Sequence, residues 1–264
     1  MLSGETVAYG GTMTGLYYLW YKDYNHSSFH WFDDRNEWLQ MDKAGHFYTS
    51  YYFNKAISEG FKITNMSAKQ SVIYGSGMSF VFMLSIEIFD GFSEKWGASG
   101  SDIFANTFGI GSFACQEFFW KEQRITPKFS YHNTVYSQYR TDALGENLIQ
   151  RLLKDYNGQT YWLSFNIKSL TGLNSAPSWL NFAFGYSGDG MLGGNNNYWP
   201  DMPDDIPEFE RKRQYYFSMD FDLTKIKTKS KILKIVFTAV NTVKMPFPAI
   251  EFFDNKIKLR PLYF

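Results

Sequence analysis

Residues 71–86 read SVIYGSGMSFVFMLSI, a run without a charged side chain. Two similar uncharged runs accompany it, TVAYGGTMTGLYYLWY at 6–21 and IFANTFGIGSFACQ at 103–116. Each is shorter than the roughly 20 residues that cross a bilayer core. Such segments are either buried helices of a compact bundle or membrane helices that pack through small residues such as Gly75 and Gly77. We expect helices that lie in or on a membrane.

Helix start and stop signals place these runs within longer helices. Ser67 suits the N-cap of one helix and Gly91 its end, and Pro127 closes the next. The sequence therefore predicts an all-α first half. Its four predicted helices are 5–22, 36–60, 67–91 and 99–125.

The sequence changes character after residue 127. One further helix is predicted at 141–155, and residues 188–207 have the composition of a loop. Alternating apolar and polar residues, rich in aromatic and β-branched types, then predict strands. The predicted strands are 161–170, 179–187, 214–223 and 232–240. The expected fold class is α+β: a four-helix, aromatic-rich, membrane-associated bundle over 1–127, then one helix and a β-rich region over 128–264.

Composition supports a membrane setting and argues against nucleic acid. Aromatic residues make up 20% of the 264 residues, with 26 Phe, 19 Tyr and 8 Trp. Tyr and Trp favour surfaces that are half apolar and half wet, as at a membrane interface; an aromatic-rich soluble core is the alternative. The formal net charge is zero, so no nucleic-acid partner is expected. A single cysteine, Cys115, excludes an internal disulfide and a cysteine-based zinc site.

The helical half carries ionisable and polar side chains in three short groups near predicted helix ends. Within each group, spacings of three or four residues put side chains on one helix face. In an antiparallel bundle, the start of the second helix, the end of the third and the start of the fourth lie at the same end. We therefore expect one polar cluster there. Its candidate catalytic residues are His46, Asp42, Glu87 and Asp102, and its candidate binding residues are Lys43, Asp90, Ser99 and Asn106.

Three interpretations of this cluster remain open. It is a structural network in which Lys43 pairs with Glu87 or Asp102, since buried charges must be paired. Alternatively, it is a catalytic site with His46 as general acid or base and a carboxylate that orients it. Thirdly, it is a carboxylate-rich metal site, although one histidine is few for zinc. No metal ligand set is assigned and no cofactor is expected, because the sequence has no nucleophile elbow, phosphate loop or dinucleotide fingerprint.

Several stretches of the chain resemble a known family. EWLQMDKAGHFYTSYY and SIEIFDGFSEKWGASGSDIFANTFGIGSFACQE are similar to the YfiM-like family of predicted periplasmic lipoproteins. LLKDYNGQTYWLSFNI and WLNFAFGYSGDGM resemble its longer Bacteroidota form, so the similarity covers about 15–190. A fainter similarity links the helical half to VanZ-like membrane proteins, with D-K-x-x-H-F, a later Glu and D-x-x-x-N-x-x-G. These patterns correspond to Asp42, Lys43, His46, Phe47, Glu87, Asp102, Asn106 and Gly109.

The resemblance implies a location in the Gram-negative cell envelope, associated with the membrane and exposed to the periplasm. No cleavable signal peptide or lipobox cysteine is visible near Met1. The first functional hypothesis is a scaffold or accessory subunit that contacts another envelope protein through its β-rich half. The alternatives are an enzyme acting on a lipid or cell-wall intermediate through His46, and a small-ligand or metal-binding module.

Overall fold

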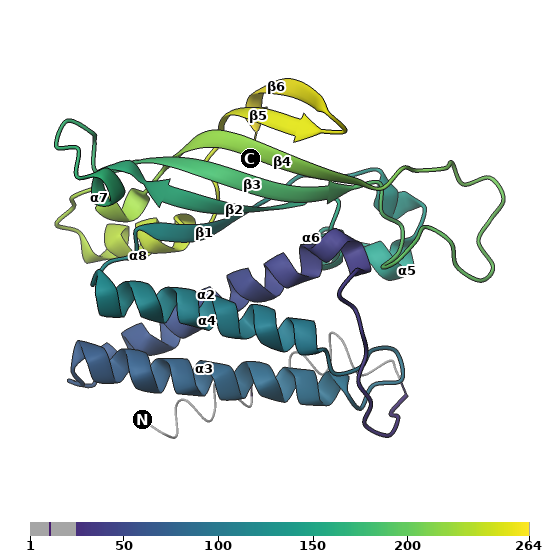
Figure 1. Ribbon diagram of the computed structural model, residues 1–264, viewed down its shortest axis with the longest axis horizontal. Helices are drawn as coiled ribbons and strands as arrows, with labels where there is room; N and C mark the ends of the chain where they lie inside the picture. Colours follow the sequence, from purple (N-terminus) through teal and green to yellow (C-terminus); the bar gives the residue numbers. More distant parts are fainter. Residues whose placement is uncertain (1–10, 12–24, 264) are drawn as a thin grey trace. The chain divides into compact units, whose positions relative to one another are not determined.

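A computed structural model describes residue 11 and residues 25–263 of the chain (Figure 1). Long helices occupy the first half, and an antiparallel six-stranded sheet occupies the second. The chain divides into two compact units. The first comprises Met1–Arg35 and Thr49–Cys115, and the second comprises Asn36–Tyr48 and Gln116–Phe264. The boundary predicted at residue 127 stays a prediction.

Three long helices are described in the first half: α2 (Met41–Lys62), α3 (Ala68–Asp90) and α4 (Gly100–Phe119). They confirm the helices predicted within 36–125. The helix predicted at 5–22 lies, apart from Gly11, outside the described residues, so the count of four is not confirmed. A short 3-10 segment, η2 (Glu37–Gln40), precedes α2.

The limits of α3 follow the predicted caps. The Ser67 hydroxyl accepts a hydrogen bond from the Gln70 backbone N–H at 3.3 Å, and the Gln70 side chain accepts one from the Ser67 N–H at 3.2 Å. This reciprocal pair is a capping box, which satisfies two backbone donors at the helix start. The helix ends with Gly91 as its C-cap.

The predicted end of the fourth helix at Pro127 is wrong. The helix α4 ends at Phe119, and Pro127 lies inside strand β1 (Ile125–Tyr131). The Gln116 side-chain oxygen accepts hydrogen bonds from the backbone N–H groups of Arg124 and Ile125, at 2.9 and 2.8 Å. These bonds hold the chain in a turn directly after the helix, so that the helix ends before the proline is reached.

The helices of the first unit approach one another through small and polar side chains. A Cβ atom on Gly75 would lie 2.2 Å from the Ser58 hydroxyl and 3.0 Å from the Ser58 Cα. The Asn54 side-chain amide donates hydrogen bonds to the Ser76 hydroxyl at 3.0 Å and to the Ile110 carbonyl at 3.1 Å. Close packing through small residues and hydrogen bonds between helices is typical of membrane helices. Two apolar clusters complete this core: Tyr51, Val72, Phe113 and Ala114, and Phe82, Met83 and Ile110.

The second unit is built on an antiparallel meander in which each strand pairs with the next along the chain. After β1, its strands are β2 (Gln159–Asn166), β3 (Leu180–Asp189), β4 (Lys212–Phe221), β5 (Phe247–Phe253) and β6 (Lys256–Tyr263). The strands predicted at 161–170, 179–187 and 214–223 correspond to β2, β3 and β4. Short helical segments connect the strands: η3 (Tyr136–Gln138), α5 (Thr141–Leu144), α6 (Leu148–Lys154), α7 (Ile167–Thr171), η4 (Leu223–Lys225) and α8 (Lys231–Val240).

Two predictions for the second half are corrected. The strand predicted at 232–240 is the helix α8, because Ser230 caps it and its apolar residues also recur at helical spacing. The single helix predicted at 141–155 is two short helices, α5 and α6. Gly145 separates them with a φ of 95°, a left-handed conformation that a helix interior cannot contain.

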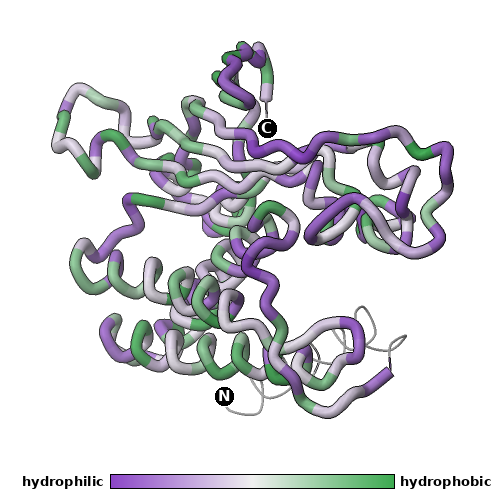
Figure 2. The backbone as a smooth tube through the Cα atoms, turned by 45° about the vertical axis from the view of Figure 1, so that its right-hand side comes forward, coloured by the Kyte–Doolittle hydropathy of each residue, from purple (hydrophilic) through white to green (hydrophobic). Residues whose placement is uncertain are grey.

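The sheet has one buried polar face and one apolar face that is partly exposed. Residues paired across β2, β3 and β4 show this most clearly. Leu163 pairs with Phe184, and Phe184 with Phe217, and the first two side chains are exposed. On the opposite face, the side chains from β1 to β5 are buried and mostly polar: Thr126, Lys128, Ser130, Thr160, Ser164, Asn166, Asn181, Ser187, Ser218, Asp220 and Glu251. Figure 2 shows hydrophobic residues recurring along both the strands and the long helices.

Candidate functional site

The start of α4 carries a buried network of hydroxyl and carboxylate groups. Ser99 precedes the helix, and its hydroxyl accepts a hydrogen bond from the Asp102 backbone N–H at 3.1 Å. The Ser99 and Ser101 hydroxyls donate to the same Asp34 oxygen, at 2.5 and 2.6 Å. Asp34 and Ser99 are both buried. A buried carboxylate that accepts two hydroxyl bonds is satisfied without a cation.

Glu87 connects the end of α3 to this network. Its side chain is 1% exposed and accepts hydrogen bonds from the Ser99 backbone N–H at 3.4 Å and from the Asn106 side-chain amide at 3.3 Å. The bond from Ser99 places the carboxylate at the N-terminal end of α4, where the helix dipole favours negative charge. Glu87, Ser99 and Asn106 are therefore brought together, as the spacing predicts.

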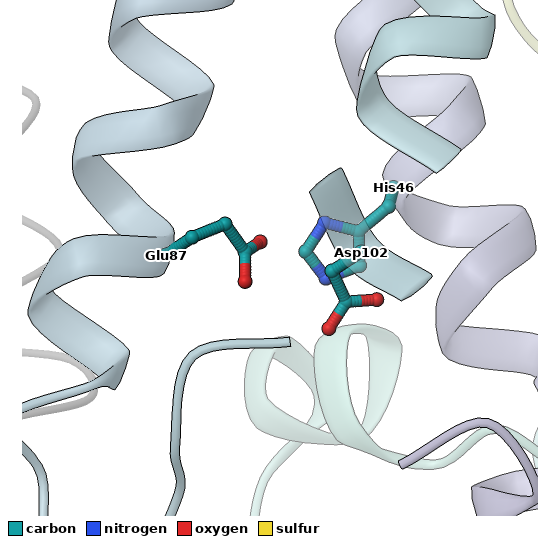
Figure 3. Close-up of side chains that lie close together, drawn as sticks. All are labelled: His46, Glu87 and Asp102. Carbon is teal, nitrogen blue, oxygen red and sulfur yellow. The ribbon is translucent and has the colours of Figure 1, made fainter. Parts of the chain in front are cut away.

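The start of α2 supplies the remaining predicted residues. Asp42 and Lys43 are half-buried and form an ion pair at 2.8 Å. Within the first unit, carboxylate oxygens of Glu87 and Asp102 lie within 4.8 Å of each other, and so do those of Asp34 and Asp102. Figure 3 shows the side chains of Glu87 and Asp102 together with that of His46, which belongs to the second unit. Carboxylate groups at such distances suit either a hydrogen-bonded network or an oxygen-rich metal site.

The structure adds one residue to the predicted set, whose functional roles stay predictions. Asp90 lies in the last turn of α3, three residues after Glu87, and is half-buried. Sequence reasoning missed Asp34 as a member of the cluster. Asp34 belongs to the acidic connector FHWFDDRNEW, which returns to the start of α4 because the Phe32 N–H donates to the Ala98 carbonyl at 2.9 Å. The two adjacent aspartates of this connector, Asp33 and Asp34, are the sequence feature that could have indicated its place in the cluster.

A second buried charged group lies in the second unit, where no site was predicted. Asp220 on β4 pairs with Lys128 on β1 at 2.7 Å and with Lys244 at 3.9 Å, and all three side chains are fully buried. Ser164 donates a hydroxyl bond to Asp220 at 2.6 Å. Burial lowers the pKa of Lys244 to about 8, and Asp220 partly opposes this shift. The three charged residues lie far apart in sequence, so no local sequence pattern predicts that they form one group.

A cavity of about 490 Å³ opens in the loop between β3 and β4. None of the predicted site residues is among its lining residues, which include Leu192, Tyr198, Phe209 and Arg211. The Arg211 side chain is held in place by hydrogen bonds to the carbonyls of Gly193, at 2.6 Å, and Gly194. The loop predicted from composition at 188–207 is thus folded against its own backbone.

Comparison with known proteins gives one match. Residues 30–116 match the model of a family described as "Predicted periplasmic lipoprotein (DUF2279)". The matched segment contains α2, α3, most of α4 and every residue of the polar cluster. This similarity supports a location in the cell envelope. No curated protein and no solved structure matches the chain, and the narrower resemblances to the YfiM-like and VanZ-like families stay predictions.

Proposed function

We propose that the protein is a membrane-seated component of the cell envelope that acts as a scaffold or accessory subunit. The observation that carries this proposal is the distribution of side chains around α3. In a water-soluble bundle, a helix buries its large apolar residues and exposes its polar ones. The helix α3 has much of the reverse arrangement, which suits a lipid environment.

The buried face of α3 is rich in small or polar side chains, including Ser71, Gly75, Ser79 and Glu87. Most of the exposed side chains of α3 are large and apolar. These large apolar side chains are Ile73, Tyr74, Met78, Phe80, Val81, Ile88 and Phe89. A polar or ionisable group inside a membrane helix is expected to face the protein interior, as Glu87 does.

Among the described residues, α3 is the helix with the length and apolar composition of a membrane span. The core helix of a soluble protein also passes this test, but such a helix is mostly buried. In α3, 33% of the most apolar 18-residue window is buried. Low burial together with high apolar content therefore favours contact with lipid.

The scaffold role rests on the internal pairing of the polar cluster. Asp34 and Glu87 accept hydrogen bonds from Ser99, Ser101 and Asn106. A network whose donors and acceptors satisfy one another fixes the geometry of the helices that carry it. The apolar face of the sheet, with Leu163 and Phe184 exposed, then offers a surface for another envelope protein.

A catalytic or metal-binding role for the cluster is the second candidate, favoured by the buried carboxylates of Glu87 and Asp102, which lie within 4.8 Å of each other in the first unit. Glu87→Gln removes one charge and keeps a hydrogen-bonding side chain of the same size. A structural network predicts lower thermal stability for this variant, and no change on adding Zn²⁺, Mn²⁺ or Ca²⁺. A metal-dependent rise in the melting temperature of the wild type that Glu87→Gln abolishes would instead establish the metal site.

The membrane proposal is tested by Val81→Lys in α3. Val81 is 63% exposed, so lysine there is tolerated in water but costs about 2.5–3.5 kcal/mol near the middle of a membrane helix. We expect the variant to be depleted from the membrane fraction that resists alkaline carbonate extraction. Val135→Lys is the matched control, because Val135 is 59% exposed and lies outside α3. Recovery of untagged wild-type protein in the soluble fraction without detergent contradicts the proposal.

A further inference from the structure

The helix α8, in the second unit, is an exposed amphipathic helix. Ser230 caps its start, since the Ser230 hydroxyl accepts a hydrogen bond from the Leu233 backbone N–H at 3.3 Å. With a helical repeat of 3.6 residues, Ile232, Ile235 and Val236 fall on one side, and Lys234 and Thr238 fall on the other. None of its ten residues is buried.

The apolar side of α8 is left uncovered by the described part of the chain. Ile232 is 73% exposed and Ile235 is 70% exposed, and Leu233, Val236 and Val240 are exposed as well. Adjacent exposed aliphatic side chains on one helix face mark a surface that binds another apolar phase. Scattered single apolar residues would carry no such meaning.

The chain around α8 is strongly basic. Between Asp222 and Glu251 there is no acidic residue, whereas lysines occur at 225, 227, 229, 231, 234 and 244. Lys225 pairs with Glu122 at 2.9 Å, and Lys244 is buried. Lys227, Lys229, Lys231 and Lys234 are exposed, and the structure shows no ion pair for them with any described residue. These four positive charges are available to an external anionic surface.

The second unit holds the C-terminal end of α8 firmly. The Asn241 side-chain oxygen accepts hydrogen bonds from the Leu223 backbone N–H at 2.9 Å and from the Lys128 ammonium at 3.2 Å. The next residue is tied to β1, because the Phe129 N–H donates to the Thr242 carbonyl at 3.0 Å. The apolar side of α8 is therefore presented in a fixed orientation by the body of the unit.

We propose that α8 lies in the headgroup region of an anionic lipid bilayer. Ile232, Ile235 and Val236 enter the boundary with the acyl chains, and the exposed lysines contact negatively charged headgroups. A short helix with an aliphatic face, basic residues and no acidic ones has the features of an interfacial membrane helix. The inference rests on the proposed membrane location of the protein, but it concerns a different element from α3.

The test places an environment-sensitive fluorophore on α8 of the full chain. Cys115→Ser removes the native thiol, which is exposed, and Ile235→Cys or Thr238→Cys provides a single labelling position. Each labelled protein is reconstituted into vesicles of phosphatidylcholine alone or of phosphatidylcholine with phosphatidylglycerol. We expect blue-shifted emission and quenching by spin-labelled lipid at position 235 in the anionic vesicles, reversed by high salt. The matched position 238, on the polar side, should remain in water.

Charge variants supply the second arm of the test. One basic residue near an anionic surface contributes about 1 kcal/mol, or about five-fold in binding. Lys229→Gln combined with Lys231→Gln should therefore weaken the lipid contact of the 235 label by about 25-fold. Lys256→Gln combined with Lys258→Gln in β6 removes the same charge from exposed positions and should leave the contact unchanged.

The outcomes separate this inference from the proposed function. If the protein floats with vesicles while the label at position 235 stays in water, the α8 proposal is overturned and the membrane proposal is left intact. Flotation with anionic vesicles only, released by salt, supports α8 and contradicts an embedded α3. Burial of the 235 label that is equal in both vesicle types and insensitive to salt overturns the proposal, because anionic headgroups then contribute nothing to the contact.

Discussion

At the start of α4, one hydroxyl serves two neighbouring elements. The Ser99 hydroxyl accepts a hydrogen bond from the Asp102 backbone N–H and donates one to the Asp34 carboxylate. The first bond satisfies a helix-terminal donor, and the second compensates a buried negative charge. The same residue therefore links helix capping to the polar cluster of the first unit.

Replacing Ser99 by alanine removes both bonds. We expect Ser99→Ala to lower the free energy of unfolding by about 1–2 kcal/mol, measured by thermal or chemical unfolding in detergent. Thr107→Ala is the control on the same helix, because the exposed Thr107 hydroxyl bonds only to the Ile103 carbonyl one turn earlier. The control should change stability by no more than about 0.5 kcal/mol. Equal effects for both variants would contradict the double role of Ser99.

Lys244 makes the stability of the second unit dependent on pH. Its pKa is about 8 in the folded protein and 10.5 without the protein environment, and burial is the main cause. Between these values the unfolded chain binds more protons, so stability rises with pH. Below pH 8 the lysine is charged in both states and contributes no further pH dependence.

We therefore expect wild-type stability to increase between pH 8 and 9 and Lys244→Met to lose this increase. The effect over this range is about 1 kcal/mol, because one pKa unit corresponds to about 1.4 kcal/mol. Closer to pH 10 the buried tyrosines oppose it, since burial raises the pKa of side chains such as Tyr161 and Tyr263 above that of the unfolded chain. Unfolding midpoints measured across this pH range provide the test. Lys256→Met, at an exposed position in β6, should keep the wild-type pH dependence. A wild-type stability that does not change across this pH range would show that burial does not lower the pKa of Lys244.

At the scale of elements, α3 contains two glycines with different surroundings. A Cβ atom on Gly75 would lie 2.2 Å from the Ser58 hydroxyl on α2, whereas a Cβ on Gly77 would meet no atom within 4 Å. The first glycine therefore allows close approach of two helices. The second has no packing role among the described residues.

This difference predicts opposite responses to alanine. Gly75→Ala should destabilise the first unit by about 1–3 kcal/mol, because added volume in a packed contact forces neighbours to move. Gly77→Ala should be neutral or stabilise it by up to about 1 kcal/mol, since alanine is the better helix former. Unfolding of both variants in the same detergent supplies the comparison. A loss of stability with Gly77→Ala as large as that with Gly75→Ala would refute the assignment of the contact.

At the scale of the whole molecule, the chain forms two compact units with separate buried polar groups. The group of Lys128, Asp220 and Lys244 belongs to the second unit and joins β1 to β4 and to the segment before β5. Buried ion groups are weak evidence for stability, but removing one partner leaves uncompensated charge. A protein with two units is also not expected to unfold in one cooperative step.

Asp220→Ala tests both statements, because it leaves two buried lysines without their shared carboxylate. We expect a loss of about 3–5 kcal/mol in the second unit, measured by hydrogen exchange resolved by segment. Amide protection should fall in β1 to β4 and stay unchanged in α3. Asp205→Ala, in the exposed loop between β3 and β4, is the control. An equal loss of protection in α3 would mean that the two units unfold together.

Local signals in the sequence determined the long helices and part of the polar cluster. Ser67 predicted the start of α3 because its side chain bonds within the first turn. The spacing of Glu87 from Asp90, and of Asp102 from Asn106, predicted that each pair shares one helix face, because an α-helix repeats every 3.6 residues. These features depend on residues that lie within a few positions of one another in the chain. The sequence alone therefore contains the information that predicts them.

Tertiary structure alone decided the features that depend on distant partners. The run ILKIVFTAV suits a strand or a helix equally by composition; in the structure it is α8, capped by Ser230. β5 was not predicted as a strand, and it forms through pairing with β4 and β6. Asp34 joins Ser99, 65 positions away, and Lys128 joins Asp220 across the sheet. Such contacts arise only when the folded chain brings remote segments together, because no short window of sequence contains both partners.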